Sequence, residues 1–318
     1  MNREDVLSDV VEDISIRKGM SVSDLVSAMR ASGGFTAKKL ADGTEILQRM
    51  IEDEDCLRFL SFPACIIATG ARGIIKDMLK LGWFDVVITT CGTVDHDLAR
   101  SWAEYYHGSF DMDDALLHRE GVNRLGNVLV PNESYGKILE ERIQPVLEQM
   151  WEEGTRRIST KDLLWRFGSS LDDQGSILYW AAKNKIPVYV PGITDGAFGY
   201  QAWSFWQEHK DLTIDVFQDE KELSDMVFEA EKTGALMIGG GISKHHTMWW
   251  NQFKGGLDYA VYVTTALEYD GSLSGARVRE GISWGKVAEE ASEVTIEGDA
   301  TAFLPIMMAC LLERTRSI

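Results

Sequence analysis

The chain has 318 residues, of which 45% are hydrophobic, so it can bury the core of one large domain or two modest ones. Its formal net charge of −18 leaves no basic field to attract phosphates, which argues against nucleic-acid binding. The acidic surplus favours cationic ligands or basic protein partners, or it serves only to keep the chain in solution.

The N-terminus and the cysteines indicate a soluble, cytoplasmic protein. The first residues, Met1–Asp5, contain no apolar signal core, and no uninterrupted apolar run is long enough to span a membrane. The four cysteines form no CxxC pair, and Cys65 and Cys91 lie in apolar, strand-like runs. We therefore expect both to be reduced thiols in the core.

The first sixty residues are predicted to be helical. One helix face would carry apolar residues at Val6, Val10, Val11 and Ile14. Ser21 or Ser23 could cap the next helix, which would end at Gly33-Gly34.

Short β-branched runs then alternate with helical stretches. These expected strands are residues 64–68, 85–89, 187–190, 213–216, 236–238, 259–263 and 294–296. Most are apolar throughout, which is typical of parallel strands covered by helices on both faces. The alternation predicts an α/β fold with a doubly wound, mostly parallel sheet of the Rossmann-like kind.

Small residues follow several of these strands. They include Thr90, Cys91 and Gly92 after one strand, and Gly239-Gly240-Gly241 after another. Such loops let backbone amides approach a phosphate at the carboxyl edge of a sheet, so a nucleotide site is favoured. No G-x-G-x-x-G follows the first strand, so the ordinary dinucleotide fingerprint is absent.

The triple glycine leads into Lys244-His245-His246. Three glycines indicate close approach by another group, and His245 could act as an acid or base near neutral pH. A tight turn with two surface histidines explains the same pattern. A metal site is not expected, because adjacent histidines point in different directions and no third ligand has suitable spacing.

Lys286 is the strongest candidate for chemistry. It follows Trp284 and Gly285, and a lysine partly desolvated beside an indole loses its proton more easily and attacks carbonyls or imines. A solvated lysine after a buried tryptophan is the alternative. Glu280 and the acids of residues 268–277 could anchor a cationic substrate, or could pair with Arg277 and Arg279.

Ordered motifs across roughly residues 35–310 resemble deoxyhypusine synthase. They are Asp85–Thr90, Val130–Tyr135, Tyr179–Ala181, Ile186–Gly196, Ile238–Gly241, Lys244–His246, Asp258–Tyr262, Asp270–Ser272, Ser274–Arg277 and Ser283–Lys286. The resemblance divides the chain into an N-terminal helical extension, residues 1–34, and an NAD-binding catalytic domain, residues 35–318.

The resemblance implies that NAD oxidises spermidine and that the aminobutyl arm passes through an imine on Lys286 to a lysine of translation factor 5A. His245 would assist proton transfer. The implied substrate-binding residues are Asp95, His96, Tyr200, Gly271, Ser272, Leu273, Glu280 and Trp284. The implied cofactor-binding residues are Thr69, Thr90, Cys91, Gly92, Asp195, Gly240, Thr265, Ala266, Asp270, Ser274, Asp299 and Ala300. A homotetramer is implied too, a dimer of dimers with shared active sites, and the N-terminal segment could gate the entrance.

Three positions depart from the family pattern. The acids expected at 96, 200 and 273 are His96, Tyr200 and Leu273. Each missing carboxylate removes a charge-assisted hydrogen bond of about 1.5–3 kcal/mol. This leaves the amine donor and acceptor open. The alternatives are transfer to a small amine such as putrescine, giving homospermidine, a non-catalytic paralogue that regulates an active subunit, and a generic NAD-binding module.

Overall fold

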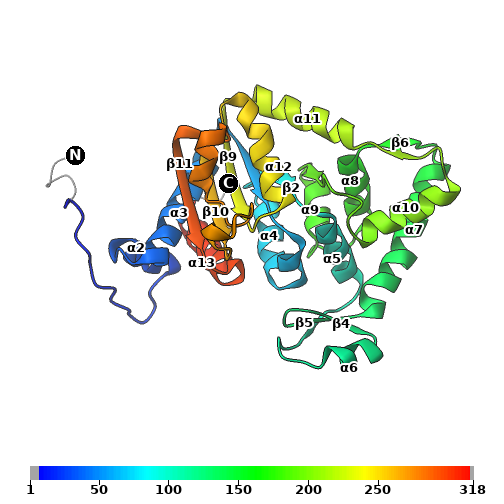
Figure 1. Cartoon of the computed structure of the whole chain (residues 1–318), viewed down its shortest axis with the longest axis horizontal. Helices are drawn as coiled ribbons and strands as arrows, with labels where there is room; N and C mark the ends of the chain where they lie inside the picture. Colours follow the sequence, from blue (N-terminus) through cyan, green and yellow to red (C-terminus); the bar gives the residue numbers. More distant parts are fainter. Residues whose placement is uncertain (1–6, 316–318) are drawn as a thin grey trace.

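Six parallel strands form the central sheet of the computed structural model, which describes residues 7–315 (Figure 1). Their order across the sheet is β11-β10-β9-β1-β2-β7. Counted along the chain from the β7 edge, this is the order 3-2-1-4-5-6 of the dinucleotide-binding fold, which confirms the predicted fold class. The strands are β1 Cys56–Ser61, β2 Val86–Ile88, β7 Val188–Tyr189, β9 Lys232–Ile238, β10 Leu257–Thr264 and β11 Val287–Glu297.

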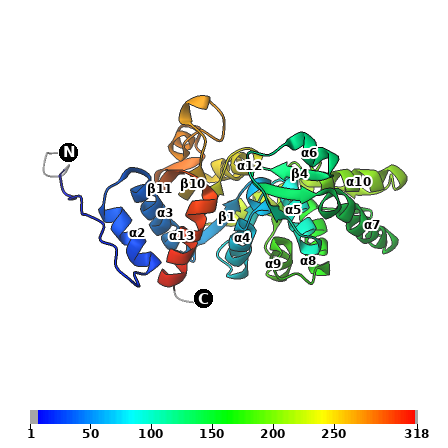
Figure 2. The same cartoon turned by 90° about the horizontal axis from the view of Figure 1, so that it is seen from below.

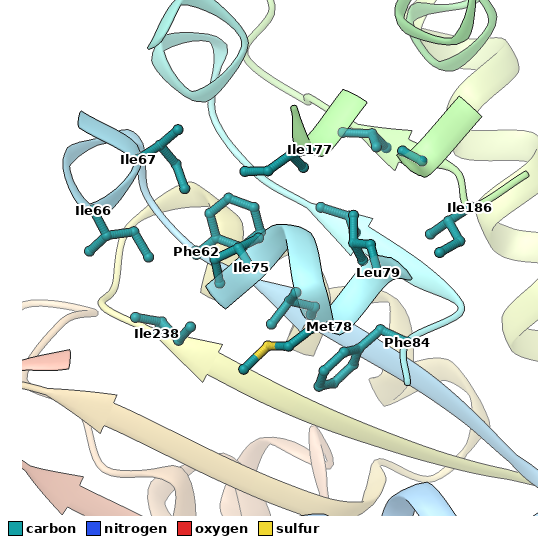
Figure 3. Close-up of a cluster of buried hydrophobic side chains, with 14 of the residues drawn as sticks. Phe62, Ile66, Ile67, Ile75, Met78, Leu79, Phe84, Ile177, Ile186 and Ile238 are labelled. Atoms are coloured by element: carbon teal, nitrogen blue, oxygen red, sulfur yellow. The ribbon is translucent and has the colours of Figure 1, made fainter. Parts of the chain in front are cut away.

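Helices cover both faces of this sheet. In β1, Leu60 faces a core to which nine of the described α-helices contribute, whereas Phe59 faces α11 and α12. Figure 3 shows part of the first core, where Phe62, Ile75 and Met78 meet. Six of these nine helices are α3 Phe35–Glu52, α4 Ala71–Lys80, α5 Cys91–Trp102, α8 Thr160–Ser170, α9 Ile177–Lys183 and α13 Ala300–Arg314, and the other three are α2 Val22–Ala31, α7 Gly136–Glu152 and α10 Ala197–Glu208. On the second face lie α11 Val216–Glu229, α12 Ile242–Asn251 and the 3₁₀ helix η5 Val278–Trp284.

One expected strand was wrong, and another is shorter than expected and lies outside the main sheet. Residues 64–68 form the 3₁₀ helix η1 Ala64–Ala68, and the first strand is β1, within the stretch predicted to be helical. Arg58 interrupts the apolar pattern by which this strand would be predicted. Its guanidinium pairs with Asp85 at 2.8 Å, and this ion pair allows the arginine side chain to be half-buried. Cys65 on η1 is exposed, which corrects its expected place in the core, whereas Cys91 is buried. Residues 213–216 contribute only β8 Thr213–Ile214, which pairs with β6 Arg157–Ile158 outside the main sheet.

The N-terminal extension is helical only in part. Ser21 accepts a hydrogen bond from the Asp24 amide at the start of α2 Val22–Ala31, as predicted. Residues 8–21 form no helix, and Val10 and Val11 are 80% and 71% exposed. The predicted first helix is therefore wrong where the structure describes it, and Val6 lies outside the described residues. The apolar spacing of these residues predicted a buried helix face, but in the described part of the chain their side chains are not packed into the core.

Three helices and a small antiparallel sheet lie toward the β7 edge. Figures 1 and 2 place α7 and α10 at the end of the molecule opposite α2, and β4, β5 and α6 to one side. The helices are α6 Asp114–Arg119, α7 Gly136–Glu152 and α10 Ala197–Glu208, and the short antiparallel strands are β3 Tyr106–His107, β4 Val122–Leu125 and β5 Val128–Pro131. The 3₁₀ helices are η2 Asn132–Ser134, η3 Gln252–Lys254 and η4 Glu268–Asp270. No described helix is both long and apolar enough to cross a membrane.

A buried ion pair joins α4, α5 and α9. Asp97 of α5 is fully buried and accepts from Arg72 Nε at 2.7 Å. It also accepts from the Ser176 hydroxyl and from the amides of Ile177 and Leu178. Asp97, although it belongs to α5, therefore caps the first turn of α9.

Replacing Asp97 should destabilise the protein strongly, because Arg72 would keep a buried charge without its main partner. We expect Asp97→Ala to lower the free energy of unfolding by about 3–5 kcal/mol in urea denaturation. Asp77, an exposed acid on α4 paired with Lys76, provides the control, and Asp77→Ala should cost at most about 1 kcal/mol. Equal losses from the two variants would contradict this account.

Candidate active site

Lys286 enters the site through a left-handed turn. The helix η5 ends at Trp284, and Gly285 has φ +67°, a conformation that glycine adopts without steric cost. The Lys286 amide then donates to the Gly281 carbonyl at 2.9 Å, and β11 begins at the next residue. Lys286 Nζ lies 5.5 Å from the ring centroid of Trp284 and 6.0 Å from that of Trp249. The amine therefore lies between two indoles, within cation–π range.

One face of α12 lines a pocket of about 360 Å³ beside this lysine. Its residues are Lys244, His245, Met248 and Trp249, spaced as on one side of a helix, and Gln252 at the start of η3 extends this wall. The other wall comes from the loop after β10 and from η5, and consists of Leu273, Ala276, Arg277, Glu280, Gly281, Trp284 and Lys286. The pocket thus brings together five residues predicted from the sequence: His245, Leu273, Glu280, Trp284 and Lys286.

The triple glycine is explained by contact with this loop. A Cβ on Gly240 would lie 2.4 Å from the Cα of Ser274, so only glycine fits there. Gly239 and Gly241 both have positive φ. The Ser274 carbonyl accepts from the Tyr262 hydroxyl at 2.6 Å and from the Thr264 hydroxyl at 3.0 Å. The close approach inferred from the sequence is therefore made by the protein's own chain.

Lys244 is the residue that sequence reasoning missed. Its side chain is nearly fully buried, and Nζ donates to the carbonyls of Leu273 at 2.9 Å and Ala276 at 2.5 Å. The same atom lies 3.8 Å from the ring centroid of Tyr262. Burial lowers the pKa of Lys244 to about 8. The neighbouring residues in the sequence do not distinguish a buried lysine from a solvated one, so the sequence carried no signal that Lys244 joins α12 to the loop after β10.

The charges of the pocket are mostly positive. Glu280 is the single carboxylate among its lining residues, beside Lys244, Arg277 and Lys286. Arg277 Nε lies 4.0 Å from Glu268, so the alternative of a structural ion pair holds for that arginine, and it also lies 3.6 Å from Glu297, an acid outside the predicted set. Burial lowers the pKa of His245 below its usual 6.5, and the charge of Lys286 lowers it further. At pH 7 His245 is therefore neutral and able to accept a proton.

The other predicted substrate residues lie outside this pocket. Asp95 is buried and accepts from the Ala197 and Phe198 amides at the start of α10, and its burial raises its pKa. His96 Nδ1 lies 2.9 Å from the Tyr105 hydroxyl, and burial lowers its pKa to about 4. Tyr200 is exposed on α10. The exposed residues Gly271 and Ser272 belong to the loop that carries Leu273.

The predicted cofactor residues follow the carboxyl ends of the strands. Thr69 follows β1 and η1, Thr90, Cys91 and Gly92 follow β2, Asp195 follows β7, Gly240 follows β9, Thr265, Ala266, Asp270 and Ser274 follow β10, and Asp299 and Ala300 follow β11. Thr69 and Asp299 line a second cavity of about 710 Å³, which we call the switch-point cavity because part of its lining is η1, which follows β1 at the reversal of strand order. Open α/β sheets bind ligands at this place. Within residues 7–315, no three His, Cys, Asp or Glu side chains group as a metal would require.

Comparison with known proteins gives one consistent result. A family model described as deoxyhypusine synthase matches residues 24–311. Curated relatives named "Probable deoxyhypusine synthase" come from Picrophilus torridus, 52% identical, and Thermoplasma acidophilum, 53% identical; each match spans 98% of this chain and 100% of the relative. A crystal structure described as a deoxyhypusine synthase from Entamoeba histolytica shares the fold with a TM-score of 0.68 at 18% identity, covering 97% of this chain and 99% of that one.

The lowered pKa of His245 gives a test of the pocket. Removing the positive charge of Lys286 in a Lys286→Met variant should raise the pKa of His245, although burial will still hold it below 6.5. Histidine NMR titration measures this directly. Lys210→Met, a change at a lysine that lies over Trp206 on another part of the surface, should leave the titration unchanged. An unaltered His245 titration in Lys286→Met would mean that the two groups do not interact.

Proposed function

Because the chain belongs to the deoxyhypusine synthase family and is an aminobutyl transferase of that kind, we propose a specific reaction for it. The aminobutyl arm of spermidine passes through an imine on Lys286 to a lysine of translation factor 5A, with NAD as the cofactor. The observation that carries this proposal is the shared pocket of Lys286, His245, Glu280 and Trp284.

The pocket residues suit the successive steps of the transfer. NAD, when bound, takes a hydride from the amine and later returns it. The Lys286 amine adds to the carbon of the oxidised arm, the three-carbon diamine leaves, and a C=N bond to Lys286 remains. The acceptor lysine then attacks the same carbon and releases Lys286. Neutral His245 is placed to take a proton from an ammonium group, so that the resulting amine can attack, and successive imine exchange keeps a reactive aldehyde out of water.

The apolar walls of the pocket suit a methylene chain. Trp249, Trp284 and Met248 offer apolar surface, and Glu280 offers one carboxylate for an ammonium group. Both indoles are partly exposed, at 43% for Trp249 and 68% for Trp284. Such large exposed aromatic surfaces beside a reactive lysine favour cover by another protein surface.

We further propose that a second copy of the chain completes each active site. No residue lines both the Lys286 pocket and the switch-point cavity, and the predicted amine ligands Asp95 and Tyr200 lie away from both. Hydride transfer needs the nicotinamide to meet the amine directly, so one chain by itself leaves the reactants apart. The homotetramer implied by the family resemblance brings one chain's lysine to another chain's cofactor.

The switch-point cavity fits the cofactor. It lies at the carboxyl edge of the sheet, and its lining includes Thr69, Asp299 and the aromatic side chains of Tyr106 and Phe110. Asp299 would accept from a ribose hydroxyl, as acids at this edge do in dinucleotide-binding folds. Thr69 and Asp299 would thus hold the nucleotide, and the loops carrying Gly240 and Asp270 would border its other end.

Borohydride trapping tests the reaction. With NAD and labelled spermidine, reduction should leave an aminobutyl group on Lys286, located by peptide mass spectrometry. Lys286→Arg should abolish the adduct and lower turnover by several orders of magnitude, whereas Lys254→Arg, a matched change outside the pocket, should keep both. Label at any other lysine would contradict the assignment of Lys286.

The acceptor is decided by a competition. Enzyme loaded with NAD and labelled spermidine, and left unreduced, should pass its label from the Lys286 imine to translation factor 5A or to putrescine when one of them is added. The proposal expects labelled protein in the first case. Labelled homospermidine with no labelled protein would favour transfer to a small amine, the alternative raised by Leu273, Tyr200 and His96.

A further inference from the structure

The switch-point cavity contains one arginine that no part of the proposed mechanism uses. Arg100, near the end of α5, lines this cavity together with Thr69, Tyr106, Phe110 and Asn127. The sequence pattern gave it no role, because a basic residue in the last turn of a helix is the ordinary means of stabilising that end.

Two carbonyls hold the Arg100 guanidinium in place. Its Nη1 donates to the carbonyl of Ile67 at 2.7 Å and to that of Thr69 at 2.6 Å. The Tyr105 ring lies 5.9 Å from its central carbon. These contacts fix the plane of the group against η1 and the loop that follows β1. The side chain is thus anchored by a single nitrogen.

The opposite edge of the guanidinium is unused. Within residues 7–315, neither Nε nor Nη2 makes a hydrogen bond, and no carboxylate lies within 4.0 Å of the group. Nε–H and one Nη2–H point the same way and form the fork that accepts two oxygens of a phosphate or carboxylate. Burial lowers the pKa of Arg100, and the charge of Arg72 lowers it further. The protein therefore holds a partly desolvated cation that an anion would stabilise.

The position of Arg100 corresponds to a missing element of the fold. In dinucleotide-binding sheets, the turn after the first strand binds the pyrophosphate through a glycine-rich fingerprint. Here that turn is Pro63 followed by η1, which carries no such fingerprint. Arg100 comes from the neighbouring helix and reaches the same turn, since both of its carbonyl partners belong to it.

We propose that Arg100 binds a phosphate group of the dinucleotide in the switch-point cavity, in place of the absent glycine-rich turn. The exposed rings of Tyr106 and Phe110, which line the same cavity, offer flat surfaces for the base of the dinucleotide. In a chain of net charge −18, this cation also opposes the repulsion that a phosphate would otherwise meet. The proposal rests on the proposed use of NAD and adds the group that recognises its phosphates.

Calorimetric titration with three ligands isolates the phosphate contact. NAD, ADP and adenosine are each titrated into the full-length protein and into Arg100→Met, Arg100→Lys and Arg142→Met variants. Arg142 is an exposed arginine on α7, away from the cavity, and provides the matched control. Arg100→Met should bind NAD and ADP about 10- to 100-fold more weakly, the loss expected from a charge-assisted hydrogen bond, and adenosine within about twofold of the unaltered protein.

The outcomes separate binding from support of the loop. Equal weakening of all three ligands in Arg100→Met would show that Arg100 only positions the turn, and unchanged NAD and ADP affinity would also overturn the proposal. If thermal unfolding shows that Arg100→Met does not fold, Arg100→Lys decides. That variant keeps the charge without the fork, so we expect NAD binding to weaken severalfold, and unchanged affinity overturns the proposal. Failure of the unaltered protein to bind NAD would instead overturn the proposed function itself.

Discussion

The close contact between the glycine turn after β9 and the loop after β10 is the constraint on which the active-site pocket depends. Gly240 lies so close to Ser274 that no side chain fits at position 240, and the hydroxyls of Tyr262 and Thr264 donate hydrogen bonds to the Ser274 carbonyl. Lys244 then joins α12 to the same loop through two carbonyls. One wall of the pocket is α12 and the other is this loop with η5, so their separation is set by backbone contact rather than by flexible side chains. His245 and Lys286 therefore face the same space.

The parallel sheet explains why the chemistry is divided. Parallel strands bring their carboxyl ends to one edge, and there the chain gathers the loops predicted to hold the cofactor. Lys286 directly precedes β11, so it lies at the amino end of that strand, whereas the predicted cofactor loops lie at the carboxyl ends of the strands. It lines the same pocket as α12. A single chain thus separates its lysine from its switch-point cavity. This geometry favours assembly with a second copy, in which the exposed tryptophans of the pocket would also find cover.

Particular residues show how much of the fold and of the site could be predicted from the sequence. Five predicted residues share the pocket, because the spacing from Lys244 to Trp249 is helical and the motif around Lys286 is compact. The predicted position of the first strand along the chain was wrong. Arg58 interrupts the apolar pattern of the true strand, and the apolar residues of η1 made residues 64–68 resemble a strand. An ion pair with Asp85, from a different part of the chain, decides that case. Lys244 and Arg100 were overlooked, because their burial depends on segments distant in sequence.

The sequence by itself determined the alternation of strands and helices, the small residues at the strand ends and the lysine beside a tryptophan. These features are local, since they follow from apolar periodicity, glycine and short motifs, and family resemblance could read them in order. Only the tertiary structure decided which charged groups are buried, that the triple glycine meets Ser274, and that Asp97 caps α9. It also decided that Lys286 does not line the switch-point cavity. Such facts depend on contacts between residues far apart in the chain, and no local pattern specifies the desolvation or the partner that each group acquires on folding.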